Sequence, residues 1–341
     1  MPQEARYYQQ EGDLTTCLLC PQVCRLQEGQ KGICGVRQVE KGKLVTLNYG
    51  LIGAISVDPI EKKPLYHFYP GKEILSLGTI GCSLHCGFCQ NWTLSRGDPH
   101  KLQEKLTPTG VMSLLESRLP SQQLGIAYTY NEPFVWYEFV RDTSELLSAN
   151  GYCNILVTNG MVNQEPLEDL LPFIHGMNID VKAFRDDFYR RYCKGKGVDD
   201  ILRTVELSSA RCHVELTYLV IPTLNDDLGE VKEFVNWVAA LDQEIPVHFS
   251  RYSPSYQLDV PATPLETMEK IYHMAREKLS YVYLGNMMLK DASSTFCPSC
   301  DNLLLKRTGT GIKNVGLEHK KCNKCGNSIR IHGNIYGDDR M

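Results

Sequence analysis

The sequence predicts an α/β fold in which parallel strands form a partial or full (β/α) barrel of the TIM type. The first observation is alternation: from residue 74 onward, short β-branched segments alternate with segments whose apolar residues recur every three or four positions. The second is that unusual polar residues directly follow the ends of the predicted strands. A doubly wound open sheet would also show the alternation. We favour the barrel because it brings the loops after many strands to one face.

Each predicted strand is a short run of β-branched and apolar residues bounded by turn-forming residues. The strands are expected at residues 74–80, 124–130, 154–159, 177–183, 214–221, 247–252 and 281–286. Helical periodicity predicts helices between them at 134–150, 198–210, 228–241 and 265–279. Asp199 and Asp227 stand where helix N-caps are expected, because their carboxylates can accept hydrogen bonds from unpaired backbone amides.

The strand at 177–183 carries a polar stripe. Neighbouring side chains of a strand point to opposite faces, so Asn178, Asp180 and Lys182 share one face. Charged groups on a central strand are costly to bury unless they line a cavity, and we therefore expect this face to line the barrel. The alternative is an edge strand with one face in water. For His248, on the sixth strand, we expect a hydrogen-bonded position in the core, with a place in the site as the alternative.

The chain divides into three parts by composition. Residues 1–70 are predicted as a Cys-rich N-terminal extension, 71–292 as the core, and 293–341 as a C-terminal module that ends in a Gly- and Asp-rich tail. Just before the core, the segment 58–71 either covers the mouth of the barrel or forms a solvated linker stiffened by prolines. Its polar residues are Asp58, Glu61, Lys62, Lys63 and His67.

Eleven of the fourteen cysteines fall into three groups. The N-terminus has no apolar run typical of a signal peptide, and no segment approaches the about 18 apolar residues of a membrane span. We therefore expect a cytoplasmic protein. In that reducing compartment, clustered thiols indicate metal binding or catalysis rather than disulfides. The isolated Cys153, Cys193 and Cys212 are expected to pack as small apolar residues or to lie in exposed loops.

Two of the groups contain four cysteines each. In the C-terminal module, two C-x2-C pairs separated by about twenty residues predict a zinc-ribbon-like site, because four thiolates complete a tetrahedral shell. The N-terminal group has a spacing that predicts either zinc or an auxiliary iron–sulfur cluster. The first set is Cys297, Cys300, Cys322 and Cys325, and the second is Cys17, Cys20, Cys24 and Cys34.

The central group has only three cysteines. Cys82, Cys86 and Cys89 are spaced C-x3-C-x2-C within GCSLHCGFCQN, in the loop after the first strand of the core, and Phe88 precedes the last of them. This segment resembles the radical S-adenosylmethionine (SAM) superfamily. The resemblance implies a [4Fe–4S] cluster on the three cysteines whose open iron binds SAM. It also implies an oxidoreductase that cleaves SAM to a 5′-deoxyadenosyl radical, which abstracts hydrogen from a substrate.

Other segments are similar to those of pyruvate formate-lyase-activating enzymes, also called [formate-C-acetyltransferase]-activating enzymes. These are TYNEP (129–133), TNG (158–160), DVK (180–182) and VIPTLNDD (220–227). The similarity implies that SAM is contacted by Phe88, Asn131, Glu132, Thr158, Asp180 and Lys182. The activating enzymes have an Asp before their TNG, whereas this chain has Val157, which argues against a bound monovalent cation there.

The N-terminal cysteines, residues 58–71, the central loop and the terminal ribbon together resemble the radical SAM member of the AmmeMemoRadiSam system. The resemblance implies an electron donor such as flavodoxin or ferredoxin, and a protein substrate or Memo-type and AMMECR-type partners. The expected reaction is hydrogen abstraction from a glycyl residue of a protein, as by an activase, or from a small molecule. One alternative is an RNA-modifying enzyme that docks through the ribbon, although the net charge of −4 argues against nucleic acid. The other is a non-catalytic iron–sulfur protein.

Overall fold

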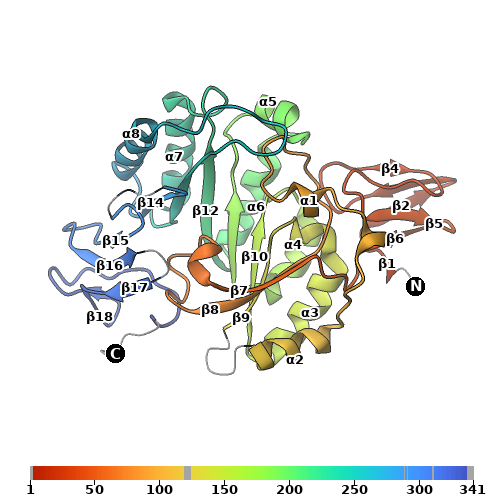
Figure 1. The fold of residues 1–341 in the computed structure, drawn as a ribbon, viewed down its shortest axis with the longest axis horizontal. Helices are drawn as coiled ribbons and strands as arrows, with labels where there is room; N and C mark the ends of the chain where they lie inside the picture. Colours follow the sequence, from red (N-terminus) through yellow and green to blue (C-terminus); the bar gives the residue numbers. More distant parts are fainter. Residues whose placement is uncertain (1–2, 119–123, 288, 290, 309–310, 336–341) are drawn as a thin grey trace.

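The computed structural model describes residues 3–118, 124–287, 289, 291–308 and 311–335 (Figure 1). The predicted Gly- and Asp-rich tail lies largely outside these residues. Of the helices that the structure describes, none has both the length and the apolar character needed to cross a membrane.

An eight-stranded sheet forms the centre of the molecule, in the order β14-β13-β12-β11-β10-β9-β8-β7. Neighbouring strands from β8 to β14 are parallel, and β7 is antiparallel to β8. The seven predicted strands correspond to β8–β14, and the α/β prediction is confirmed in its partial-barrel form, with β7 and β14 at the two edges. The bounds are β7 (Ala54–Pro59), β8 (Glu73–Gly78), β9 (Gly125–Tyr128), β10 (Cys153–Thr158), β11 (Gly176–Asp180), β12 (His213–Val220), β13 (Val247–Arg251) and β14 (Val282–Gly285).

Helices pack against the sheet between its parallel strands (Figure 1). The longer ones are α2 (Pro108–Arg118), α3 (Tyr137–Ala149), α4 (Gln164–Leu170), α6 (Asp199–Ser209), α7 (Leu228–Asp242) and α8 (Leu265–Arg276), with the short α1 (Trp92–Ser95) and α5 (Asp186–Phe188) near the cysteine loop. Asp227 caps α7 as predicted, since its side chain accepts a hydrogen bond from the Glu230 amide at 3.0 Å. Asp199 is instead the first helical residue of α6, after Val198, where its carboxylate faces the positive end of the helix dipole.

The N-terminal and C-terminal parts form small antiparallel sheets at opposite ends of the long axis (Figure 1). The N-terminal sheets consist of β1 (Gln3–Glu4), β5 (Arg37–Glu40) and β6 (Lys43–Thr46), and of β2 (Tyr8–Glu11), β3 (Leu14–Cys17) and β4 (Arg25–Leu26). The C-terminal sheets consist of β15 (Thr295–Phe296), β16 (Leu303–Thr308) and β17 (Gly311–Asn314), and of β18 (Leu317–Glu318) and β19 (Lys321–Cys322).

The segment 60–70 fills the barrel at the amino ends of its strands, so neither of the two predictions for residues 58–71 is correct. Strand β7 runs antiparallel to β8, and it therefore carries the chain from the carboxyl end of β8 to its amino end. There Leu65 and Phe68 are fully buried against Ile155 of β10, and Asn178 Nδ2 donates to the Pro64 carbonyl oxygen at 2.9 Å. Apolar residues between the charged ones make this segment part of the core.

A buried carboxylate connects this segment to two strands of the barrel, β12 and β13. Glu215 in β12 accepts hydrogen bonds from the His67 amide (2.7 Å), from His213 Nε2 (2.9 Å) and from His248 Nε2 (2.6 Å). Burial by itself would raise the pKa of Glu215, but the hydrogen bonds from the two histidines hold it well below its ordinary value. His248 therefore has the core position that its sequence context predicted.

His67 is held as a neutral ring. Its Nδ1 donates to the Arg330 carbonyl oxygen at 2.7 Å, which leaves Nε2 to accept from the Tyr283 hydroxyl at 2.5 Å. Burial lowers the pKa of His67 to about 4. Protonation would remove the acceptor that Tyr283 uses, so the folded state resists it.

We expect the free energy of unfolding to fall as the pH is lowered from about 6.5 to about 4. In this window the unfolded chain binds a proton at His67 and the folded chain does not, so stability rises with pH, by on the order of 3 kcal/mol in total from this group. Denaturant unfolding at several pH values measures the slope. His67→Gln should reduce it, whereas His273→Gln, at an exposed position of α8, should leave it unchanged. If the free energy of unfolding of His67→Gln depended on pH as steeply as that of the wild type, the acid sensitivity would come from other groups.

Candidate functional site

A cavity of about 260 Å³ at the carboxyl ends of the parallel strands brings together the residues predicted to bind the cluster and SAM. The residues come from the carboxyl ends of β8, β9, β10 and β11 and from the loops that follow them, and they extend from residue 82 to residue 182 of the chain. The predicted residues that line it are Cys82, Cys86, Phe88, Cys89, Asn131, Glu132, Thr158, Asp180 and Lys182.

The cysteine loop begins at a turn that only glycine can make. Gly81 has a φ of +93°, and a Cβ there would lie 2.8 Å from the carbonyl oxygen of Cys34 in the N-terminal extension. Further along the loop, the His85 amide donates to the Cys193 carbonyl oxygen at 2.7 Å, and the Gly87 amide donates to the Tyr192 carbonyl oxygen at 3.0 Å. The loop is therefore fixed between the N-terminal extension and the turn 189–193.

The three thiols are arranged too openly for a single metal ion. Four thiolates around one zinc ion at about 2.3 Å lie about 3.8 Å apart. Within the described residues, only the C-terminal cysteines bring three or more such ligand atoms within 4.8 Å of one another. Cys82, Cys86 and Cys89 do not meet this criterion, and their position around one cavity leaves room for a larger group such as a [4Fe–4S] cluster.

Two further side chains approach the cysteine sulfurs, and neither was among the predicted site residues. Asn159 Nδ2 donates to Cys82 Sγ at 3.6 Å, and Ser95 Oγ lies 3.6 Å from Cys89 Sγ. Hydrogen bonds to cluster sulfurs are one of the means by which proteins set reduction potential. Asn159 belongs to the TNG segment, so the motif itself could have indicated it.

The isolated Cys193 also reaches the site. Its thiol contacts Cys86 and raises the pKa of that thiol, and burial raises it further. Burial likewise raises the pKa of Cys82 well above its ordinary value. Both thiols are therefore neutral in the metal-free protein, and binding of iron would require them to lose their protons.

Glu132 connects the loops after β9 and β10. Its Oε1 accepts from Thr158 Oγ1 (2.7 Å) and from the Phe134 amide (3.1 Å), and its Oε2 accepts from the Asn159 amide (2.8 Å). Burial raises the pKa of Glu132 to about 7, against the opposing effect of these hydrogen bonds. The carboxyl group thus orients the loops after β9 and β10, and it also lines the cavity.

Asn131 and Tyr130 complete the loop after β9. Asn131 Nδ2 donates to the Gly81 carbonyl oxygen at 2.9 Å and so connects this loop to the cysteine loop. Tyr130, whose φ is +73°, lines the cavity, and its hydroxyl donates to Asp58 Oδ2 at 3.0 Å. The same oxygen accepts from the buried Lys63 at 2.8 Å. Tyr130 lies in the TYNEP segment but was not among the SAM contacts that the sequence predicted.

Asp180 and Lys182 form an ion pair of 2.8 Å at the carboxyl end of β11. Strand β11 pairs with β10 and β12, so the edge-strand alternative is wrong. Burial alone would lower the pKa of Lys182, but the Asp180 carboxylate raises it above its ordinary value. Asn178, on the same face, lies deeper in the barrel and does not line the cavity. Val157 does line it, with no oxygen ligand in its side chain.

The C-terminal cysteines fit a single tetrahedral ion. Cys297 Sγ lies 3.6 Å from Cys325 Sγ, and Cys300 Sγ lies 3.7 Å from Cys322 Sγ. These separations match the about 3.8 Å expected between thiolates on one zinc ion. The geometry is that of the predicted zinc-ribbon-like module.

The N-terminal cysteines line one small cavity of about 10 Å³. Next to it lies the buried guanidinium of Arg37, whose Nη1 is 3.8 Å from Cys17 Sγ and which forms an ion pair with Glu138 of α3. The choice between zinc and an auxiliary cluster at this group stays a prediction. The cavity is lined by Cys17, Cys20, Cys24 and Cys34 together with apolar residues.

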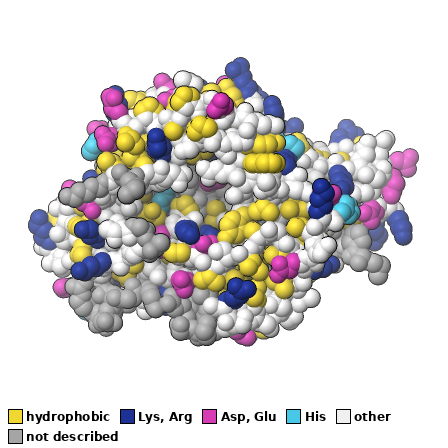
Figure 2. Space-filling view, in the orientation of Figure 1, with side chains coloured by type: hydrophobic (Ala, Val, Ile, Leu, Met, Phe, Trp, Pro, Cys, Tyr) yellow, Lys and Arg dark blue, Asp and Glu magenta, His cyan; other side chains and the backbone are white. Residues whose placement is uncertain are grey.

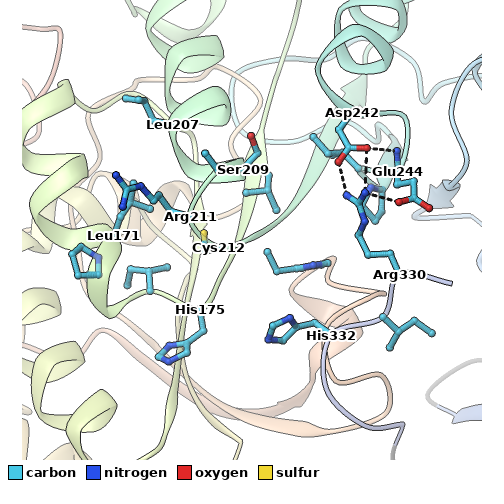
Figure 3. Close-up of a pocket in the computed structure, with 18 of the residues that line it drawn as sticks. Leu171, His175, Leu207, Ser209, Arg211, Cys212, Asp242, Glu244, Arg330 and His332 are labelled. Atoms are coloured by element: carbon cyan, nitrogen blue, oxygen red, sulfur yellow. Dashed lines mark hydrogen bonds and ion pairs between the residues drawn. The ribbon is translucent and has the colours of Figure 1, made fainter. Parts of the chain in front are cut away.

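A second, larger cavity of about 990 Å³ lies at the opposite, amino end of the strands (Figure 3). It is bounded by the segments before β11, β12 and β13 and by residues 330–332, and Arg330 points toward Asp242 and Glu244. It contains none of the predicted site residues. Because (β/α) barrels carry their chemistry at the carboxyl ends of the strands, we assign the functional site to the smaller cavity.

Comparison with known proteins agrees with this geometry. A family model described as the radical SAM superfamily matches residues 77–237. An uncharacterised protein of Methanocaldococcus jannaschii is 39% identical over 336 residues, covering 96% of this chain and 99% of that protein.

Solved structures are more distant in sequence. Streptococcus suis SuiB bound to S-adenosylmethionine aligns with a TM-score of 0.50 at 12% identity, over 62% of this chain and 52% of that one. A domain of pyruvate-formate lyase-activating enzyme from Bacteroides vulgatus aligns with a TM-score of 0.41 at 16% identity, over 47% of this chain and 98% of that one. The family match begins within β8 and includes the whole cysteine loop. The chain belongs to the radical SAM superfamily.

Proposed function

We propose that the protein binds a [4Fe–4S] cluster through Cys82, Cys86 and Cys89 and cleaves SAM reductively. The observation that carries the proposal is the single cavity in which these three thiols face the charged pair of β11. When bound, the cluster supplies the electron that breaks SAM into methionine and a 5′-deoxyadenosyl radical. The open, charged cavity argues against a non-catalytic iron–sulfur protein.

The polar residues of the cavity suit the methionine end of SAM, which carries an ammonium, a carboxylate and a sulfonium. Lys182 can bind the carboxylate, and Asp180 can bind a cationic group, so the ligand would replace part of their mutual contact. Glu132 and Asn131 orient the loops on the other side of the cavity. Phe88 and Tyr130 add aromatic walls.

The proposal is tested by anaerobic reconstitution with iron and sulfide, followed by incubation with SAM and dithionite. We expect 5′-deoxyadenosine to accumulate. Protein with a full complement of iron that forms none would contradict the proposal.

Asp180→Ala is expected to weaken SAM binding by about 2–5 kcal/mol, the usual cost of removing one member of a desolvated charge pair. Iron content should stay at the wild-type level, since Asp180 contributes no thiolate. The cluster's EPR signal, followed during SAM titration, measures both quantities. Asp187→Ala removes a carboxylate from an exposed pair with Arg185 and serves as the control. Unchanged SAM affinity in Asp180→Ala would place SAM elsewhere in the cavity.

For the substrate, we propose hydrogen abstraction from a glycyl residue of a partner protein or from a small molecule. Support comes from the resemblance to the activating enzymes and to the radical SAM member of the AmmeMemoRadiSam system, with Memo-type and AMMECR-type proteins as the partners to test first. We also propose that the C-terminal cysteines hold one zinc ion. RNA modification is less favoured, because two of the ribbon's cations are already used: Arg307 is buried, and Arg330 pairs with Asp242 and Glu244.

A further inference from the structure

Exposed cations lie next to the cysteine loop, in the segment that follows α5. Arg191, Lys194 and Lys196, in and after the turn that follows α5, are exposed. Of the carboxylates in the described residues, none forms an ion pair with these three side chains, whereas the neighbouring Arg190 pairs with Asp186 at 2.8 Å. Lys and Arg side chains gather along the edge of the molecule over α5 (Figure 2). In a chain with a net charge of −4, this is a local concentration of positive charge.

The cationic turn is in direct contact with the cysteine loop. Its backbone carbonyls at Tyr192 and Cys193 accept hydrogen bonds from the amides of Gly87 and His85, and the Cys193 thiol contacts Cys86. One layer of residues therefore separates the exposed cations from the thiols.

Exposed apolar residues of the N-terminal extension continue this surface. Gln22 Nε2 donates both to the Lys194 carbonyl oxygen and to the Ser83 carbonyl oxygen, at 2.9 Å each. Beside it, Val23 is 42% exposed and Ile33 is 36% exposed, and the Ile33 carbonyl oxygen accepts from His85 Nε2 at 2.8 Å.

Together these residues make an apolar centre with a cationic margin directly outside the cysteine loop. We call it the basic surface, and it consists of Val23, Ile33, Arg191, Lys194 and Lys196.

We propose that the basic surface is the docking site of an acidic protein that donates one electron at a time. The inference rests on the proposed function, which consumes one electron for each SAM cleaved at its sulfonium, and the donor is oxidised by that one electron. Complementary charge steers such an encounter and sets its rate, and electron-transfer interfaces are typically small and short-lived. Electron transfer requires a short distance between the donor and the cluster. A donor on the basic surface would be separated from the cluster ligands by one layer of residues, so it would not need to enter a deep cleft.

The test compares two reductants on the reconstituted holoenzyme. Reduced flavodoxin is the acidic protein donor, and dithionite is a small donor that needs no docking site. The variant Arg191→Glu/Lys196→Glu reverses two charges of the basic surface, and Lys306→Glu/Lys313→Glu makes the same change of charge on exposed residues of β16 and β17 as a matched control.

With flavodoxin at about 50 mM salt, we expect 5′-deoxyadenosine formation to fall roughly tenfold or more in the Arg191→Glu/Lys196→Glu variant. With dithionite the rate should stay within about twofold of wild type, and the control variant should match wild type with both donors. Raising the salt to about 300 mM should slow the wild type with flavodoxin and change the variant much less.

Two outcomes would overturn the proposal: an unchanged flavodoxin-driven rate in the variant, or an equal loss with dithionite, which would indicate damage to the site. Absence of product with dithionite in the wild type would instead contradict the proposed function. In that case the salt-dependent binding of oxidised flavodoxin, measured by calorimetry, still tests the surface. If flavodoxin does not bind but a single-stranded RNA probe does, and the variant abolishes that binding, the surface is a nucleic-acid site and the proposal fails.

Discussion

Replacement of Cys82, Cys86 or Cys89 by Ala is expected to reduce SAM cleavage to the background of an unreconstituted sample. Each thiol lines the same cavity, and two remaining thiolates cannot hold the cluster in the position that leaves one iron open to SAM. Iron content, the cluster's EPR signal and 5′-deoxyadenosine measure the loss. Each variant should fold normally, because the site is assembled by backbone hydrogen bonds of the loop rather than by the thiols.

Two controls separate this effect from general damage. Cys212→Ala removes a thiol that lines the opposite cavity and should retain iron and activity. Zinc content should be the same in the central variants as in the wild type, because Cys297, Cys300, Cys322 and Cys325 are untouched. Product formation by a variant that lacks all three central cysteines would refute the assignment of the cluster.

Arg37→Met is expected to destabilise the fold by about 3–5 kcal/mol, because it leaves a buried carboxylate without its cation. Arg37 is 1% exposed and its partner Glu138, on α3, is 3% exposed. Arg37 also donates to the Arg6 carbonyl oxygen at 2.8 Å and lies beside Cys17. The pair thus joins the N-terminal extension to the core. Denaturant unfolding with a constant m-value measures the loss.

The double variant Arg37→Met/Glu138→Leu should recover much of that loss, since it removes the stranded charge along with its partner. The exposed pair of Lys270 and Glu266 on α8 is the control, and Lys270→Met should cost less than about 1 kcal/mol. A cost for Arg37→Met no larger than that of the control would mean that water reaches Glu138 and that the pair is not a structural link.

The parts of the fold that were predicted correctly depend on local patterns. The seven parallel strands of the core are each marked by a short β-branched run, and the helices by their periodicity. Strand β7 was missed because its residues, AISVDP, look like part of the polar segment that follows, and its pairing with β8 requires a contact across fourteen or more positions. The buried position of residues 60–70 depends on that same pairing.

The candidate site residues that the sequence indicated also belong to short local motifs. Cys82, Cys86 and Cys89 lie within eight positions, so their common role is visible in the sequence, and the short motifs after the strands indicated Glu132, Thr158, Asp180 and Lys182. Their placement around one cavity agrees with the rule that barrel loops meet at the carboxyl ends of the strands.

The sequence by itself determined the strand–helix alternation, the cysteine groups and the polar stripe of β11, because each is set by neighbours in the chain. Only the tertiary structure decided which end of the barrel residues 60–70 close, that Cys193 contacts Cys86, and that Tyr130 lines the cavity. It also placed an exposed cationic turn against the N-terminal extension. These arrangements depend on contacts between segments tens to more than a hundred residues apart, and such contacts are selected by the packing of the whole core rather than by local sequence.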